Sequence, residues 1–294
     1  MKKNFVLIIG AMKCGTTSLF HYLAEHPQVC PAKDKEPHFF SYERRFAKGI
    51  SWYESLWDWQ SEHEIAMEAS TTYTMHPKYL QVPERIVQTQ DGNFRFIYVM
   101  RHPFARIESH IRHLLSGGHQ KQVEVLEEHL AFSEYARQLD FYVNIFGQDR
   151  IYLLLLEDLK RDPKPELYRI CQFLEIDPEY PFQALDLVMN SQNTLNLHPA
   201  LRRIYEIPFV KSIGKQVAPQ LRQKLYKPLS RKKSFNVELT EQDKEQILQR
   251  LQPDLTRLQT EYGIDVEHKW GLSIGNGEPG NSRSRSSEFG SSER

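Results

Sequence analysis

Four stretches of the chain consist almost entirely of apolar residues, and longer stretches with helical spacing separate them. The apolar runs cover residues 6–9, 64–69, 94–100 and 150–156. Runs of this length without polar alternation are typical of parallel strands that are buried on both faces. The sequence therefore predicts a doubly wound α/β domain, in which helices flank a mainly parallel sheet on both sides.

Helices are predicted between these runs from the spacing of apolar residues. They cover residues 16–25, 82–90, 124–146 and 163–174, and a further helix begins near Pro103. Proline suits the first turn of a helix, because the N–H that it lacks has no intrahelical partner at that position. The alternation of strands and helices is what the connections of a parallel sheet require.

The last third of the chain has a different composition. Residues 210–234 contain eight Lys or Arg residues and no acidic residue. Such a run fits a solvated face as well as contact with an acidic acceptor or an anionic membrane surface. After it, two helices are predicted over residues 240–251 and 253–262, with Thr240 and Asp243 as a capping pair.

Residues 273–294 contain hardly any apolar side chain. A segment of this composition cannot bury enough apolar surface to fold, so we expect a disordered tail or sequence added in cloning. The predicted folded domain is then residues 1–272.

Charge and cysteine content narrow the class of protein. The chain has 38 Lys and Arg residues against 38 Asp and Glu residues, so no overall field favours a nucleic acid. Cys14, Cys30 and Cys171 are an odd, widely spaced set without metal-ligand spacing, which suits a reducing compartment. No stretch reaches the roughly 20 apolar residues of a membrane span, and the run before Gly10 is short for a signal peptide. We expect a cytoplasmic protein.

A glycine-containing turn follows the first predicted strand. Gly10 and Gly15 have the spacing that begins a nucleoside-triphosphate P-loop, but Thr16 stands where that motif requires its lysine. The lysine lies inside the turn instead, at Lys13. Backbone N–H groups of such a turn, the positive end of the following helix and one lysine together favour a phosphate-type ligand.

A second candidate anion site follows the strand over residues 94–100. Arg101 stands at the end of this strand, and Ser109 follows on the helix that begins at Pro103. An arginine and a serine so placed are able to hold one phosphate from two sides. Ligands of open α/β sheets bind at the carboxyl ends of strands. Three of the predicted strands are followed by suitable residues, namely Lys13, Ser70–Tyr73 and Arg101.

Residues 10–19 closely resemble the 5′-phosphosulfate loop of sulfotransferases that use 3′-phosphoadenosine 5′-phosphosulfate (PAPS), and the resemblance extends over about residues 5–272. It implies a P-loop NTPase-like sulfotransferase fold, PAPS as cosubstrate, adenosine 3′,5′-bisphosphate (PAP) as product, and no metal. The Arg-x-Pro-x-x-Arg-x-x-Ser pattern of the family's 3′-phosphate site fits Arg101, Pro103, Arg106 and Ser109. The residues that the resemblance assigns to the 5′-phosphosulfate are Met12, Lys13, Cys14, Gly15, Thr16, Thr17 and Ser18.

Catalytic residues are also implied by resemblance. Lys35-Glu36-x-x-Phe39-Phe40 is similar to a segment of the heparan-sulfate type of sulfotransferases, in which the glutamate is the base. On this basis Glu36 is the base and Lys35 aligns the sulfate, while Lys13 stabilises the leaving oxygen. His38 is a competing base and Glu68 a weaker one. The alternative for Glu36 is a solvated pair with Lys35, and the alternative for Glu68 is a core carboxylate with satisfied hydrogen bonds.

The family closes a late loop over the nucleotide, and residues 190–199 fall where that loop is expected. The implied nucleotide-binding residues are Asn193, Thr194, Leu195, Asn196 and His198. The family's usual lysine, glycine and arginine are replaced here by Thr194, Leu195 and Asn196. Arg202 or Arg203 is a candidate for the missing cation, with a helix-surface role as the alternative.

The predicted function is transfer of a sulfuryl group from PAPS to an acceptor hydroxyl. The acceptor is a small molecule, a carbohydrate or a lipid, and the aromatic residues Trp52, Tyr53, Trp57 and Trp59 either stack on it or belong to the core. Two other classes stay open: a P-loop kinase or NTPase, and a nucleotide-binding module without catalysis. A kinase or NTPase of this class requires a lysine directly before Thr17 and an aspartate after the strand that ends at Met100. This sequence has neither.

Overall fold

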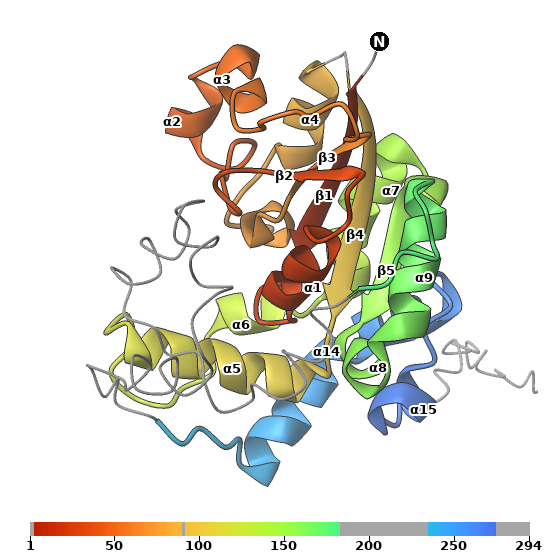
Figure 1. Cartoon of the computed structure of the whole chain (residues 1–294). Helices are drawn as coiled ribbons and strands as arrows, with labels where there is room; N and C mark the ends of the chain where they lie inside the picture. Colours follow the sequence, from red (N-terminus) through yellow and green to blue (C-terminus); the bar gives the residue numbers. More distant parts are fainter. Residues whose placement is uncertain (1–2, 90–91, 183–234, 275–294) are drawn as a thin grey trace, which may run out of the picture.

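The computed structural model describes residues 3–89, 92–182 and 235–274. At its centre is a five-stranded sheet with the strand order β2-β3-β1-β4-β5 (Figure 1). Every pair of neighbouring strands is parallel, as the sequence predicts. The strands are β1 (Lys3–Gly10), β2 (Val29–Pro31), β3 (Ile65–Glu68), β4 (Gly92–Met100) and β5 (Ile151–Leu155).

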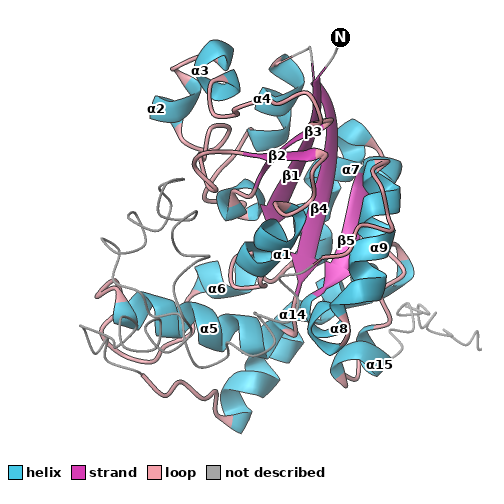
Figure 2. Cartoon of the chain, in the orientation of Figure 1, coloured by secondary structure: helices cyan, strands magenta, loops and turns pink. Residues whose placement is uncertain are grey.

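Helices flank this sheet on both sides (Figure 2). In the view of Figure 1, α1 and α9 lie in front of the sheet and α7 lies behind it. None of the helices in the described part of the chain is both long and apolar enough to cross a membrane. The described helices are α1 (Thr16–Leu23), α2 (Glu43–Phe46), α3 (Ile50–Glu54), α4 (Val82–Gln88), α5 (Pro103–Ser116), α6 (Glu127–Ala131), α7 (Tyr135–Phe146), α8 (Leu156–Arg161), α9 (Pro163–Leu174), α14 (Glu241–Thr260) and α15 (Val266–Trp270), with 3-10 helices at Thr71–Thr74 and Gln148–Arg150.

The middle strand, β1, positions the functional site. Residues 6–9 are completely buried, because helices cover both faces of the sheet here. The chain leaves β1 towards β2 and β3 on one side, and later adds β4 and β5 on the other. The strand order therefore reverses at β1, and the crevice at the carboxyl end of this strand is where sheets of this kind bind ligands.

Two predicted helical segments differ from the structure. Residues 124–146, predicted as mostly helical, form two helices, α6 and α7, instead of one. The break is built around Ser133, whose Oγ accepts a hydrogen bond from Arg106 Nε at 2.7 Å and donates to His129 O at 2.8 Å. The Ser133 hydroxyl thus binds a buried arginine in the break between α6 and α7.

The second difference is α14, which is one helix where the sequence predicts two. Pro253 lies inside it, although a proline there removes one backbone hydrogen bond. Burial of Leu251, Leu255 and Leu258 holds the two halves in line. Asp254 adds an anchor, since its carboxylate accepts hydrogen bonds from two backbone N–H groups at the start of α7. The predicted capping pair of Thr240 and Asp243 is present.

Most aromatic residues after α2 belong to the core. Tyr53 is completely buried, and the Trp57 indole donates a hydrogen bond to Met67 O at 3.2 Å. Trp52 is covered by cations, with Lys48 Nζ 4.4 Å and Arg45 Cζ 5.2 Å from its ring centroid. Of the two alternatives for this stretch, the packing supports the core.

A buried carboxyl group lies at the end of β3. Glu68 is completely buried; its Oε1 accepts hydrogen bonds from Tyr73 at 2.6 Å and Tyr53 at 3.3 Å, and its Oε2 has no partner among the described residues. Burial raises the pKa of Glu68 to about 7. This carboxyl group therefore belongs to the core network beneath the 3-10 helix Thr71–Thr74, as its structural alternative predicts.

Glu68→Gln is expected to change how stability depends on pH. The folded chain keeps the Glu68 proton up to about pH 7, whereas a glutamate in the unfolded chain has its ordinary pKa of 4.5. The stability that this group contributes is thus complete below pH 4.5 and lost as pH rises through 7. Relative to the parent, Glu68→Gln should gain about 1–3 kcal/mol between pH 5 and pH 8.

Thermal or urea unfolding at both pH values measures this difference. Glu245→Gln, at an exposed position on α14, is the control and should follow the parent. An unchanged gap between Glu68→Gln and the parent at pH 5 and pH 8 would show that Glu68 is ionised in the folded protein.

Candidate active site

A cavity of about 790 Å³ opens at the carboxyl ends of β1 and β4. It collects residues from the β1–α1 turn, the loop after β2, the ends of β3 and β4, and helices α1, α5 and α8. The lining residues are Met12, Lys13, Gly15, Thr16, Thr17, Ser18, Tyr22, Glu36, Thr71, Arg101, His113, Leu156, Leu159 and Lys160. The crevice predicted from the strand order is thus an open cavity with a cationic wall.

The β1–α1 turn aims its backbone at this cavity. Lys13 and Gly15 have positive φ values of 69° and 84°, so the chain reverses sharply before α1. The N–H groups of Thr16 and Thr17 are at the start of α1, where they have no intrahelical acceptor, and Thr16 and Thr17 line the cavity. A turn of this kind supplies several donors and the positive end of a helix dipole to one anion.

Both glycines of the turn are needed for close packing. A Cβ atom on Gly10 would lie 1.9 Å from Thr74 Oγ1, which donates a hydrogen bond to Ile9 O at 2.8 Å. A Cβ atom on Gly15 would lie 2.4 Å from Leu156 Cδ1. The turn is therefore fixed between the 3-10 helix after β3 and the helix after β5.

Arg101 is hydrogen-bonded to the backbone of the β1–α1 turn. Its Nη1 donates to Lys13 O at 3.3 Å, and its own backbone oxygen accepts a hydrogen bond from Tyr135 OH at 2.6 Å. The same tyrosine lies 3.9 Å from the Sγ of Cys14, a buried thiol whose pKa burial raises to about 12. Cys14 is thus a packed, protonated support of the turn.

The loop after β2 places a carboxylate on the other side of the cavity. Glu36 Oε1 accepts a hydrogen bond from Lys35 Nζ at 2.6 Å, and Glu36 Oε2 accepts one from Thr71 Oγ1 at 3.4 Å. His38 Nε2 lies 3.8 Å from the same Oε2, and His38 Nδ1 is 2.9 Å from Thr72 Oγ1. Burial lowers the pKa of His38 below its ordinary value.

Charged groups on both sides of the cavity affect the pKa of Lys13. Burial, followed by the charges of Arg101 and Arg112, lowers the pKa of Lys13, whereas the Glu36 carboxylate raises it. An anion bound between these cations would relieve their mutual repulsion. A lysine amine, an arginine and a carboxylate thus face one space, as the sequence predicts for Lys13, Arg101 and Glu36.

The other predicted site residues do not line the described cavity. Ser109 is half-buried on α5, one turn before His113, which lines the cavity; Ser109 itself is not part of the wall that the described residues form. The late-loop residues 193–198, with Arg202 and Arg203, lie outside the described residues, as does the basic run 210–234. Their assignments stay predictions.

Comparison with known proteins decides the family. A sequence model of the sulfotransferase domain matches residues 3–250, which is most of the chain. The chain belongs to the sulfotransferase family. The residues of the turn, the β4 end and the Glu36 loop all lie inside this match.

Several of its curated relatives are heparan sulfate sulfotransferases by name. Mouse heparan sulfate glucosamine 3-O-sulfotransferase 5 is 27% identical over 189 residues, covering 58% of this chain and 53% of the relative. Mouse 3-O-sulfotransferase 3A1 is 30% identical over 186 residues, covering 57% of this chain and 44% of the relative. The chain thus spans about half the length of these relatives.

A solved structure shares the fold. The sulfotransferase from Alicyclobacillus acidocaldarius aligns with a TM-score of 0.54 and 23% sequence identity, over 76% of this chain and 99% of that one. The predicted P-loop-like sulfotransferase fold is therefore confirmed.

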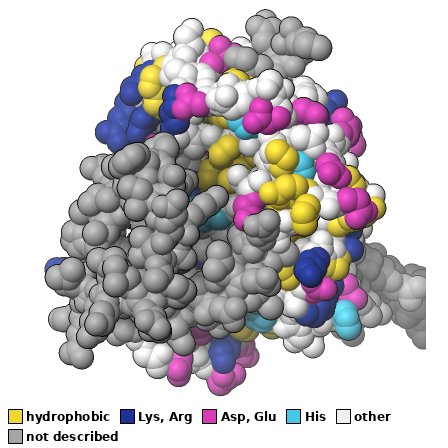
Figure 3. Space-filling model, in the orientation of Figure 1, with side chains coloured by type: hydrophobic (Ala, Val, Ile, Leu, Met, Phe, Trp, Pro, Cys, Tyr) yellow, Lys and Arg dark blue, Asp and Glu magenta, His cyan; other side chains and the backbone are white. Residues whose placement is uncertain are grey.

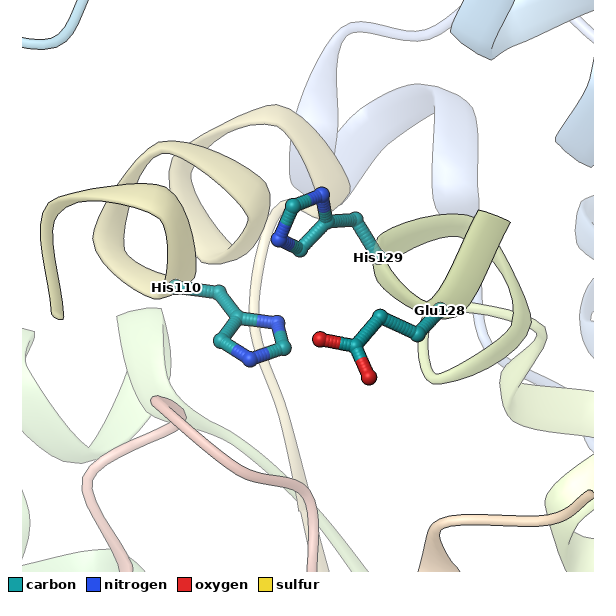
Figure 4. A group of neighbouring side chains, drawn as sticks. All are labelled: His110, Glu128 and His129. Carbon is teal, nitrogen blue, oxygen red and sulfur yellow. The ribbon is translucent and has the colours of Figure 1, made fainter. Parts of the chain in front are cut away.

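Two histidines and a glutamate come together between α5 and α6 (Figure 4). His110, Glu128 and His129 each offer one possible metal ligand, all within 4.8 Å of one another; no other such group occurs in the described ranges. However, His129 Nδ1 accepts a hydrogen bond from Leu126 N at 2.8 Å, which leaves the proton of the neutral ring on Nε2.

Arg106 also argues against a cation at this cluster. Its side chain is completely buried, and its Nη2 donates to His129 O. Burial, and then Arg106, lower the pKa of His110 to about 2 and that of His129 to about 4. A protonated ligand atom beside a buried guanidinium group does not suit a metal, so we regard the two histidines as neutral core residues.

The sequence analysis missed several residues of the cavity wall, namely Tyr22, His113, Leu156, Leu159 and Lys160. One signal was available for three of them. Leu156, Leu159 and Lys160 belong to α8, which follows β5, and the carboxyl end of this strand meets the same edge as β1 and β4. The others reach the cavity through packing that no local pattern reveals.

Gly15→Ala tests whether the turn depends on its packing. The substitution places a Cβ at positive φ and against Leu156, so both strain and overlap should destabilise the fold, by about 2–4 kcal/mol in total. Gly118→Ala is the matched control: its φ is +72° with nothing within 4 Å of the added Cβ. That variant should lose only about 1 kcal/mol, the backbone cost.

Urea unfolding of both variants measures these losses. Equal losses at Gly15 and Gly118 would show that Leu156 does not constrain the turn. In the Leu156→Ala background, adding Gly15→Ala should cost less stability than it does in the parent, because the added Cβ then has room.

Proposed function

We propose that this protein transfers the sulfuryl group of PAPS to a hydroxyl group of a carbohydrate acceptor and releases PAP. The observation that carries the proposal is the shared cavity of Lys13, Arg101 and Glu36, which combines an anion site with a carboxylate base. Membership of the sulfotransferase family and the names of the curated relatives support the reaction and the class of acceptor.

The β1–α1 turn would hold the 5′-phosphosulfate. Its lysine and the N–H groups at the start of α1 supply positive potential where the anion must lie. Arg101, at the end of β4, would hold the 3′-phosphate. The hydrogen bond from Arg101 to Lys13 O would keep the two phosphate sites at a fixed separation.

In the proposed reaction, the acceptor oxygen forms a bond to sulfur as the bond from sulfur to the bridging 5′-phosphate oxygen breaks. The electron pair of the broken bond stays on the 5′-phosphate of PAP, where Lys13 and the turn stabilise it. The acceptor proton passes to the Glu36 carboxylate. Lys35, hydrogen-bonded to Glu36 at 2.6 Å, would orient this carboxylate.

Glu36 is favoured over His38 as the base by position. Glu36 lines the cavity, whereas His38 is not among the described lining residues and reaches the cavity through Glu36, 3.8 Å away. Burial lowers the pKa of His38, so its ring is neutral near neutral pH and adds no charge beside the carboxylate. The kinase alternative is not favoured, because the family is that of sulfotransferases.

Glu36→Gln is expected to lower the rate of sulfuryl transfer by about 10²–10⁴-fold, because the amide cannot take the acceptor proton. PAP binding should be unchanged, since the variant keeps the size of the side chain. The assay is transfer of labelled sulfate from PAPS to desulfated and partly sulfated heparan oligosaccharides, with PAP binding followed by thermal shift.

His38→Ala is the matched comparison for this assignment. It removes a ring beside the same carboxylate and should lose less activity than Glu36→Gln. An active Glu36→Gln variant together with an inactive His38→Ala variant would assign the base to the histidine instead.

A further inference from the structure

We propose that a second cavity, next to the 3-10 helix Thr71–Thr74, binds a small quaternary ammonium cation. It has a volume of about 180 Å³ and lies between this 3-10 helix, the start of α4 and α7; we refer to it as the aromatic cavity. It shares no described lining residue with the large cavity that contains Lys13 and Glu36. The site is therefore separate from the proposed active site, and its ligand is independent of the proposed function.

The volume of the aromatic cavity limits its ligand to a small molecule. A cavity of about 150 Å³ takes one benzene ring, whereas pockets for drug-sized ligands begin at about 300 Å³. A volume of about 180 Å³ thus leaves room for a trimethylammonium group with a short tail. It is too small for a nucleotide or an oligosaccharide.

Half of the described residues that line this cavity carry an aromatic ring. Tyr73 belongs to the 3-10 helix, His76 and Tyr79 to the loop before α4, and Phe141 and Tyr142 to α7. The face of an aromatic ring has negative potential and attracts cations, and quaternary ammonium groups are bound in aromatic cages. The wall therefore has the chemistry of a site for an organic cation.

The polar groups of three lining side chains are already engaged. Tyr73 OH donates a hydrogen bond to Glu68 Oε1 at 2.6 Å, and Tyr142 OH donates one to Tyr73 O at 2.9 Å. Gln138 Oε1 accepts a hydrogen bond from His76 N at 3.1 Å, and its Nε2 donates to His76 O at 2.9 Å. These bonds hold the wall in place, so the two tyrosines offer a ligand their ring surfaces. A quaternary ammonium group needs no hydrogen-bond acceptor, which suits such a wall better than a primary amine does.

One carboxylate gives the aromatic cavity its charge. Of the described residues that line it, Glu84 alone carries a full charge, and no ion pair joins Glu84 to a described residue. Burial, and then the charge of Glu68, raise the pKa of Tyr142, and Glu84 adds to this shift, so its carboxylate acts on a ring of the cavity. His76 adds no positive charge near neutral pH, because burial and then Arg137 lower its pKa.

Basic side chains near this cavity are bound to other carboxylates. Arg137 donates a hydrogen bond to Glu134 Oε2 at 2.8 Å, and Arg85, next to Glu84 in the chain, is paired with Glu43. In Figure 3, Lys and Arg side chains gather at the upper left, where Figure 1 places α2. An aromatic cavity with one uncompensated carboxylate at its wall selects a cation over a neutral molecule of the same shape.

Choline and 3,3-dimethylbutan-1-ol test this inference, because the two molecules have the same shape and only choline is charged. Calorimetric titration of the parent should show saturable choline binding, at least about fivefold tighter than binding of the alcohol. Glu84→Gln and Phe141→Leu should each weaken choline binding by about threefold or more, because one removes the charge and the other removes an aromatic face.

Glu36→Gln is the matched control, since it removes the carboxylate of the large cavity; it should leave choline affinity unchanged. Thermal unfolding without ligand shows that each variant is folded. Equal affinity of the parent for choline and the alcohol would reduce the aromatic cavity to an apolar one and overturn the inference. Absence of choline binding to the folded parent would also overturn it, as would a loss with Glu36→Gln that Glu84→Gln does not show. None of these titrations contains PAP, so they stand apart from any test of the proposed function.

Discussion

The turn between β1 and α1 is the constraint on which the rest of the site depends. It must reverse the chain within a few residues, expose N–H groups to a ligand, and still pack against two neighbouring elements. Gly10 permits contact with Thr74, and Gly15 permits contact with Leu156. Because the turn is held by the core on both sides, its donors are fixed before a ligand arrives, and little reorganisation is needed on binding.

The sheet brings the other functional groups to this turn. Arg101 directly follows β4, the strand that pairs with β1, and its guanidinium group donates a hydrogen bond to the backbone of Lys13. On the other side, the backbone of Ala69 after β3 donates to Lys35 O at 2.8 Å, and His38 N donates to Ser70 Oγ at 3.0 Å. The loop that carries Glu36 is thus fastened to the end of a core strand. One parallel sheet thus places the cationic turn and the Glu36 carboxylate at the same edge.

The sequence was sufficient for the parts that strong local patterns determine. The helix Pro163–Leu174 was predicted to the residue, and the predicted runs 6–9 and 94–100 lie inside β1 and β4. Lys13, Arg101 and Glu36 line one cavity. Pro253 misled the prediction, because its local signal for a helix start was weaker than the packing of Leu255 and Leu258 along a continuous α14. The helix break at Ser133 could not be predicted locally, because the Ser133 hydroxyl accepts a hydrogen bond from Arg106 on another helix. Tyr22 and His113 reach the cavity only through tertiary packing, which has no signature in the sequence.

The central claim is that the cavity is built for a nucleotide with both a 5′ anion and a 3′-phosphate. Calorimetric titration of PAP and ADP into the parent protein and Arg101→Ala tests this most directly. The parent should bind PAP at least about tenfold more tightly than ADP, because one charge-assisted contact to the 3′-phosphate is worth roughly 1.5 kcal/mol or more. Arg101→Ala should lose most of that preference while keeping its affinity for ADP. Equal affinity of the parent for PAP and ADP would contradict the account.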